Sequence, residues 1–144
     1  MPRSVDYLGA TGIGVSDLAR SAAFYEKVLG MKQTQTFKLD YMDEIVLAHE
    51  GRTAVVLMHW TDGSPRDYRN NPVKLVFYVA DPKAVADKFL AEGLEVTRYP
   101  SPVPTLGNAM VGLAKDPDGY VIELLQARIP KTEEISVGDA ASRA

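Results

Sequence analysis

The most informative segment of this sequence is Asp116-Pro117-Asp118-Gly119-Tyr120-Val121-Ile122-Glu123-Leu124-Leu125. The proline restrains φ at the second position of a turn, and the glycine suits a position that often needs a positive φ. The residues that follow form a short apolar run rich in β-branched and aromatic side chains, which is typical of a strand. The segment therefore predicts a tight turn that leads directly into a strand.

A single carboxylate, Glu123, interrupts this apolar run. Because side chains alternate along a strand, Glu123 shares its face with Val121 and Leu125. On a buried face the carboxylate needs an ion pair, hydrogen bonds or a metal ion, since an uncompensated buried charge is costly. On an edge strand the same carboxylate would simply be solvated, and the segment alone leaves both alternatives open.

The composition describes one globular domain: 144 residues, 46% hydrophobic and 24% charged, with a formal net charge of −3. The lysines and arginines are scattered, and no apolar run reaches the length of a membrane span, so we expect neither nucleic acid nor a membrane as partner. The lack of cysteine excludes disulfides and thiolate metal sites. With no signal-peptide pattern at the N-terminus, we expect a cytoplasmic protein.

The sequence repeats itself after about 64 residues, so that Val15-x-Asp17 corresponds to Val79-x-Asp81. Each aspartate is a suitable N-cap for a helix, and Gly30 and Gly93 are suitable stops. We therefore predict helices near residues 17–29 and 82–92. Strands are predicted at 7–15, 32–39, 44–49 and 53–60 in the first copy, and at 73–79, 95–99, 109–114 and 120–126 in the second.

One of these assignments has an alternative. Three glycines weaken the strand at 7–15, for which a flexible loop is the other interpretation. Residues 100–108 are rich in proline and are expected to form a loop.

The repeat predicts an α+β fold in which two βαβββ modules form a cupped mixed β-sheet. We expect one domain over residues 1–129, with module one at about 7–60, a polar linker at 61–72 and module two at about 73–127. Residues 130–144 show no periodicity and are expected to form a flexible tail. Each module is too small to bury a core alone, so the modules must pair within one chain or be exchanged between subunits.

The helix motif of the first copy reads Val15-Ser16-Asp17-Leu18-x-Arg20-Ser21-x-x-Phe24-Tyr25-x-x-Val28-Leu29-Gly30-Met31. Together with the turn and strand at 116–124, it resembles the vicinal oxygen chelate superfamily, which includes glyoxalase I, bleomycin-resistance proteins and extradiol dioxygenases. The likeness runs from about residue 7 to residue 126. It implies paired βαβββ modules, a cup-shaped site and a homodimer.

Enzymes of this superfamily hold a divalent metal ion with side chains from the first and last strands of each module. The resemblance places the four ligand positions at Ala10, Leu57, Lys74 and Glu123. Alanine and leucine cannot bind a metal ion, and a protonated lysine repels one, whereas protein sites normally supply three or more ligands. We therefore expect no metal ion and no other cofactor, and we do not expect a standard metal-dependent glyoxalase I.

The resemblance also implies that Lys74 and Glu123 lie side by side, because the first and last strands of a module are neighbours. We predict that the ammonium of Lys74 replaces the metal charge and pairs with Glu123. The pair could have three roles: it could solve a burial problem only, bind a polar group of a ligand, or act in catalysis.

Strand alternation supplies the other walls of the predicted cup. Val76 and Tyr78 share the face of Lys74, while Val55 and His59 share the face of Leu57. A mostly apolar surface with a few polar groups is typical of small-molecule sites. The predicted substrate-binding residues are Ala10, Val55, Leu57, His59, Val76, Tyr78, Val121 and Leu125, with Lys74 and Glu123 as catalytic candidates.

Three functions are compatible with these residues. The first is metal-independent binding of a small apolar or aromatic molecule, as in the resistance members. The second is a lyase or isomerase of the glyoxalase type that uses Lys74 and Glu123. The third is a metal enzyme with relocated ligands, such as His59 with Glu123, although a lone histidine in a strand is more often structural.

Overall fold

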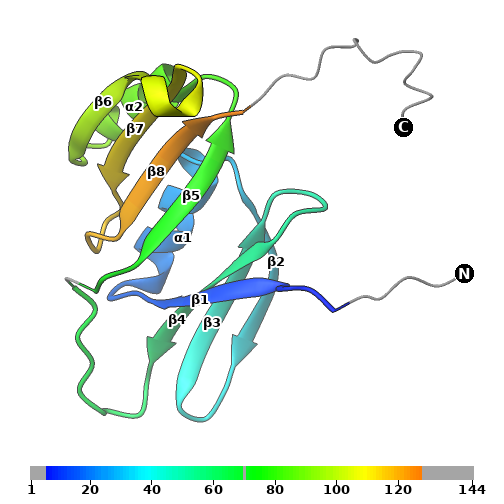
Figure 1. Ribbon diagram of the computed structural model, residues 1–144. Coiled ribbons are helices and arrows are strands. Elements are labelled where there is room, and N and C mark those ends of the chain that lie inside the picture. The colour runs from blue at the N-terminus through cyan, green and yellow to red at the C-terminus, as the bar shows by residue number, and fades with distance from the viewer. Residues whose placement is uncertain (1–5, 70, 128–144) are drawn as a thin grey trace, which may run out of the picture.

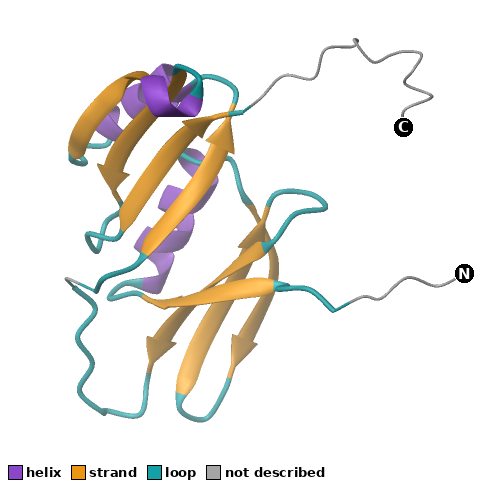
Figure 2. Cartoon of the chain, viewed as in Figure 1, coloured by secondary structure: helices purple, strands orange, loops and turns teal. Residues whose placement is uncertain are grey.

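The computed structural model describes residues 6–69 and 71–127, so the predicted tail lies outside the described residues. The first half of the chain contains β1 (Ala10–Gly14), α1 (Leu18–Lys27), β2 (Lys32–Lys38), β3 (Met42–Ala48) and β4 (Ala54–Trp60). The second half contains β5 (Lys74–Val79), α2 (Pro82–Ala91), β6 (Val96–Val103), β7 (Ala109–Lys115) and β8 (Val121–Gln126), with a 3₁₀ turn at Pro104–Leu106. Each half is a βαβββ unit, as the repeat predicts (Figures 1 and 2).

The two units build two four-stranded mixed sheets with the same strand pattern, β1-β4-β3-β2 and β5-β8-β7-β6. The first and last strands of each unit are parallel neighbours, while the remaining pairs are antiparallel. The α+β prediction with two equivalent modules is thus confirmed. The glycine-rich segment at the start of module one is a strand and not a loop.

Both helices begin and end as the sequence predicts. The Asp17 side chain accepts a hydrogen bond from the backbone N–H of Arg20 at 3.0 Å, and the Asp81 side chain accepts one from Ala84 at 3.2 Å. Gly30 adopts a φ of 72° after α1, which a side chain would disfavour.

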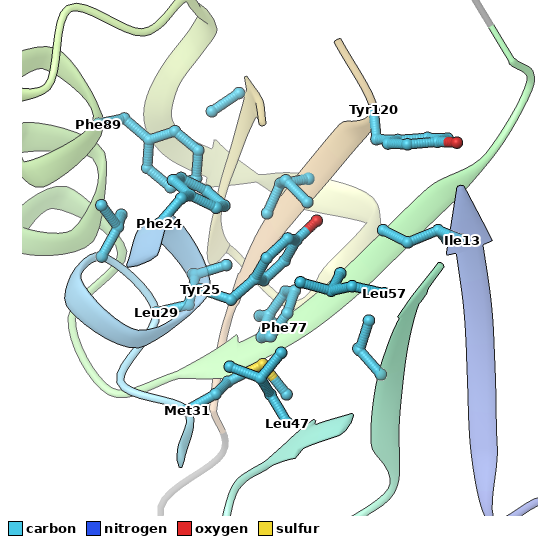
Figure 3. Close-up of a cluster of buried hydrophobic side chains, with 14 of the residues drawn as sticks. Ile13, Phe24, Tyr25, Leu29, Met31, Leu47, Leu57, Phe77, Phe89 and Tyr120 are labelled. Atoms are coloured by element: carbon cyan, nitrogen blue, oxygen red, sulfur yellow. The ribbon is translucent and has the colours of Figure 1, made fainter. Parts of the chain in front are cut away.

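One hydrophobic core serves both modules, and α1 lies between the two sheets (Figure 1). Phe24 on α1 meets Phe89 on α2 edge-on, with 5.2 Å between ring centroids. The ring centroid of Tyr25 lies 6.5 Å from that of Phe77 on β5, and Tyr25 is fully buried. Figure 3 shows these rings converging with Leu57 and Leu47 from the first sheet. The two modules therefore bury their apolar faces against each other.

The turn that precedes β8 fastens module two to module one. Asp118 accepts hydrogen bonds from the backbone N–H of Ser16 at 2.9 Å and from the guanidinium of Arg20 at 3.1 Å. Asp116 accepts one from the Tyr25 hydroxyl at 2.7 Å, and the Tyr120 hydroxyl donates to the Gly14 carbonyl at 2.6 Å. The turn identified from the sequence is thus also a contact between modules.

The predicted loop at residues 100–108 is only partly correct, because β6 continues through Pro100 and Pro102 to Val103. β6 is the edge strand of its sheet, and its register with β7 shifts twice. Proline cannot donate a ladder hydrogen bond, so edge strands and bulges are where sheets accept it.

Candidate functional site

Lys74 and Glu123 form an ion pair on the exposed face of the second sheet, with 2.8 Å between Nζ and Oε1. The predicted pairing is therefore present. The Lys74 side chain is 53% exposed and the Glu123 side chain 15% exposed, so the carboxylate is much more sheltered than the ammonium. β5 and β8 lie side by side in parallel, with Val76 opposite Glu123 and Lys74 opposite Val121 (Figure 1).

We call the surface around this pair the second open face. It consists of Lys74, Val76 and Tyr78 of β5, Val121, Glu123 and Leu125 of β8, and Leu113 and Lys115 of β7, while Val111 has the same facing but is buried. Val76 is 45% exposed and Tyr78 is 73% exposed. These apolar side chains stand on the face away from the shared core, next to a charged pair. Small-molecule sites combine a mostly apolar lining with a few polar groups, and this face offers both kinds of side chain.

The first sheet carries an equivalent surface, the first open face, formed by Ala10, Gly12 and Gly14 of β1 and Ala54, Val56 and Met58 of β4. In the second sheet Val76 lies opposite Glu123, and in the first sheet Gly12 lies opposite Val56. The repeat thus makes Val56 the equivalent of Glu123. The assignment of that position to Leu57 is wrong by one residue.

Val55 and Leu57 do not line an open face, contrary to the prediction. They are 7% and 0% exposed and belong to the core (Figure 3 labels Leu57). β4 is apolar on both faces, so its sequence does not show which face is buried. The register with β1 and β3 turns Val56 and Met58 outward instead.

His59 also faces away from the first open face. Its Nδ1 lies 2.8 Å from the Val15 carbonyl oxygen, and its ring stacks on Tyr68 with 5.5 Å between centroids. The second histidine, His49, places Nε2 2.7 Å from the Leu29 carbonyl oxygen. Both rings therefore hold backbone segments in place.

Sequence reasoning missed a pocket of about 330 Å³ beside the N-terminal end of β5. The linker forms one wall with Arg66, Tyr68 and Asn71, and β1 forms another. The Arg66 guanidinium lies 4.3 Å from the centroid of the Trp60 ring. The only signal in the sequence was the arginine and tyrosine content of a segment otherwise typical of a linker.

Sequence reasoning also missed two cations, Lys115 on the second open face and Arg98 on the neighbouring strand β6. Lys115 lies opposite Val121, and Arg98 lies opposite Leu113. The Arg98 guanidinium donates to the Ser101 hydroxyl at 2.7 Å and to the Val111 carbonyl at 3.1 Å. Their positions depend on cross-strand register, which the local sequence does not specify.

Within residues 6–69 and 71–127, no three His, Asp or Glu side chains are grouped so that they could hold a metal ion. No helix among these residues is long and apolar enough to span a membrane.

The fold and the paired modules agree with the sequence comparisons. The sequence model of the Glyoxalase/Bleomycin resistance protein/Dioxygenase superfamily matches residues 7–124, and the chain belongs to this family. It is 33% identical to a probable lactoylglutathione lyase from Synechocystis sp., over 87% of this chain and 98% of the relative. It is 32% identical to a lactoylglutathione lyase from Salmonella typhimurium, over 82% of this chain and 90% of the relative.

A solved structure supports the same assignment. Glyoxalase I from Zea mays superposes with a TM-score of 0.74 at 26% identity, over 85% of this chain. The match covers 46% of the maize chain, so this chain spans about half the length of that enzyme.

Proposed function

We propose that this protein binds a small apolar or aromatic molecule on its open faces without a metal ion. The observation that carries the proposal is the Lys74–Glu123 ion pair, set among exposed apolar side chains such as Tyr78. An ammonium group held by a carboxylate supplies a fixed positive charge and free N–H donors, which can orient a ligand.

The residues at the family's ligand positions do not fit a divalent ion. Ala10 and Val56 offer no donor atom, and Lys74 brings a positive charge to the position nearest Glu123. One carboxylate that is already paired is a poor substitute for the three or more ligands that protein sites normally provide. The donor set therefore favours binding chemistry based on the ion pair.

The expected partner subunit is a second copy of this chain. Both sheets turn one face to the shared core, and each leaves its other face open within one chain. A second molecule could cover these faces and complete a cup, because exposed apolar surface is a typical site of contact between proteins. Light scattering should show a homodimer at micromolar concentration, and a monomer that still binds ligand would contradict this arrangement.

Metal independence can be tested with N-phenyl-1-naphthylamine, a neutral aromatic probe whose fluorescence rises in apolar sites. We expect saturable binding that does not change when the protein is treated with a chelator and dialysed. The matched variant Tyr78→Ser should weaken binding, because it removes the most exposed ring of the second open face. Loss of binding with the chelator, or restoration of binding by zinc or nickel, would contradict the proposal.

A second candidate function follows from the relatives. Two of them are named lactoylglutathione lyases and are 32–33% identical to this chain over most of its length. A lyase of this type would use Glu123 to remove and return a proton, with Lys74 holding the negative charge that develops. Formation of lactoylglutathione can be monitored by the absorbance of its thioester. This activity should be lost in Glu123→Gln and absent from a buffer control.

A further inference from the structure

A second lysine, Lys115, stands on the second open face at the same level as Lys74. Val121 of β8 lies between them, opposite Lys74 on one side and opposite Lys115 on the other. Directly opposed residues of neighbouring strands project to the same side of a sheet. The Lys74–Glu123 pair identifies that side as the exposed one, because Glu123 and Val121 are two residues apart on one strand.

The spacing of the two lysines suits a shared anion. Two strand spacings separate them, which is about 10 Å between α-carbons. Each flexible four-carbon chain can lean over Val121, so the two ammonium groups can approach one small acidic group from both sides. Lys74 keeps this ability while bound to Glu123, because an ammonium has three N–H donors.

The charges on this face do not cancel. Lys74 and Lys115 are positive, and Glu123 is the one carboxylate of the face, while Arg98 on the neighbouring strand β6 adds a further positive charge. Lys115 is half-buried and takes part in no ion pair within residues 6–69 and 71–127. The positive charge of Lys115 therefore attracts anions to this apolar surface.

The two ends of this face differ in polarity along the strands. The level of Lys74 and Lys115 carries two cations, the next level contains Val76 and Leu113 on either side of Glu123, and the level after that contains Tyr78 and Leu125. Each level is about 6.7 Å from the next, since two residues of a strand span that distance. A molecule lying along β5 would thus meet cations at one end and apolar side chains at the other.

We propose that the ligand of this face is an amphipathic anion, an aromatic or aliphatic molecule with one carboxylate or sulfonate group that Lys115 binds together with Lys74. This inference rests on the proposed binding function and adds the chemical class and the orientation of the ligand. The acidic group lies at the N-terminal end of β5, and the apolar body extends toward Tyr78.

Two fluorescent probes that differ by one acidic group test this inference: 8-anilinonaphthalene-1-sulfonate and the neutral N-phenyl-1-naphthylamine. We expect Lys115→Met to weaken binding of the sulfonate about fivefold or more, because it removes one charged donor, and to change binding of the neutral probe by less than about twofold. Lys115→Arg should keep most of the sulfonate affinity. Lys83→Met, on the helix that covers the opposite side of the sheet, should bind both probes as the original protein does.

The outcomes separate the two proposals. If neither probe binds the unaltered protein, the proposed function fails. If the neutral probe binds but Lys115→Met leaves the sulfonate affinity unchanged, or weakens both probes equally, the assignment to Lys115 is wrong. Raised salt should weaken the sulfonate complex of the original protein more than that of Lys115→Met, and equal salt dependence would also overturn the assignment. Circular dichroism and thermal melts of each variant exclude loss of folding as the cause.

Discussion

The Glu123 carboxylate is tolerated on an apolar strand because Lys74 approaches it to 2.8 Å. This ion pair is less buried than a pair in a protein interior, since half of the Lys74 side chain is exposed. Solvent screens such a pair, so its contribution to stability is smaller than that of a fully buried pair. A pair that adds little stability yet stands among exposed apolar groups is easier to explain by ligand binding than by folding.

A double-mutant cycle measures this pair directly. Lys74→Met should lower the free energy of unfolding by about 1–2 kcal/mol, because Glu123 keeps a sheltered charge without a partner. Adding Glu123→Leu should recover most of that loss while ligand binding stays impaired. Urea denaturation of the four proteins gives the coupling energy. Additive single effects would show that the pair contributes nothing, and intact ligand binding in the double variant would show that it is only structural.

Asp116 is the second residue whose environment has a measurable consequence. Burial raises the pKa of Asp116, although hydrogen bonds from Tyr25 and from the backbone N–H groups of Tyr120 and Asp118 oppose the rise. The folded protein therefore keeps a proton on Asp116 at a pH where the unfolded chain has lost it. The stability that this group contributes is greatest below the unfolded pKa and falls as pH rises through the folded pKa.

Asp116→Asn should remove this part of the pH dependence, because the amide keeps an acceptor for the backbone and does not titrate. Urea midpoints measured at a series of pH values above the ordinary aspartate pKa should fall less with rising pH in the variant. Asp67→Asn, at an exposed linker aspartate, serves as the control. Parallel curves for Asp116→Asn and the original protein would contradict this expectation.

At the scale of elements, the pairing of β6 with β7 depends on a glycine. A β-carbon added at Gly112 would lie 2.7 Å from Cγ of Pro100, which is closer than such atoms approach, and 3.2 Å from its Cδ, which is a tight contact. The proline within β6 can therefore be accommodated because its neighbour in β7 has no side chain. This contact explains how a proline-rich segment joins the sheet as an edge strand.

Gly112→Ala should destabilise the protein by about 1–3 kcal/mol, as overpacking in a tight contact does. The double variant Gly112→Ala with Pro100→Ala should lose less than the sum of the single effects, because removal of the ring makes room for the methyl group. Chemical denaturation measures all three variants. A fully additive result would mean that β6 shifts freely and the contact is not tight.

At the scale of the whole molecule, the shared core makes the two modules interdependent. Phe24 on α1 packs edge-on against Tyr25 and against Phe89 of α2, with centroid distances of 4.7 Å and 5.2 Å. Since α1 belongs to module one and α2 to module two, loss of this ring affects both modules at once (Figure 3).

Phe24→Ala should reduce the free energy of unfolding by about 3–5 kcal/mol, the usual cost of removing a buried aromatic ring. The protein should still unfold in a single transition, with equal calorimetric and van't Hoff enthalpies. The exposed Phe37→Ala on β2 provides a control that should change stability little. Two separate transitions in Phe24→Ala would show that each module holds its own independent core.

The sequence alone determined the features that a few adjacent residues encode. The N-caps at Asp17 and Asp81 and the turn at residues 116–119 are local preferences of the backbone and its side chains. The resemblance to the vicinal oxygen chelate superfamily placed Lys74 and Glu123 on neighbouring strands, because the first and last strands of a module are neighbours in that family. These features could therefore be predicted before any contact between distant residues was known.

Only the tertiary structure shows which side chains face outward and that the two modules of one chain share a core. β4 is apolar on both faces, so only its pairing with β1 and β3 shows that Val56 is exposed and Leu57 is buried. The place of Lys115 opposite Val121 likewise depends on register between β7 and β8. The strand register, and with it the face to which each side chain points, is set by the free energy of burying residues that are far apart in the chain. A short segment of sequence contains no information about that burial.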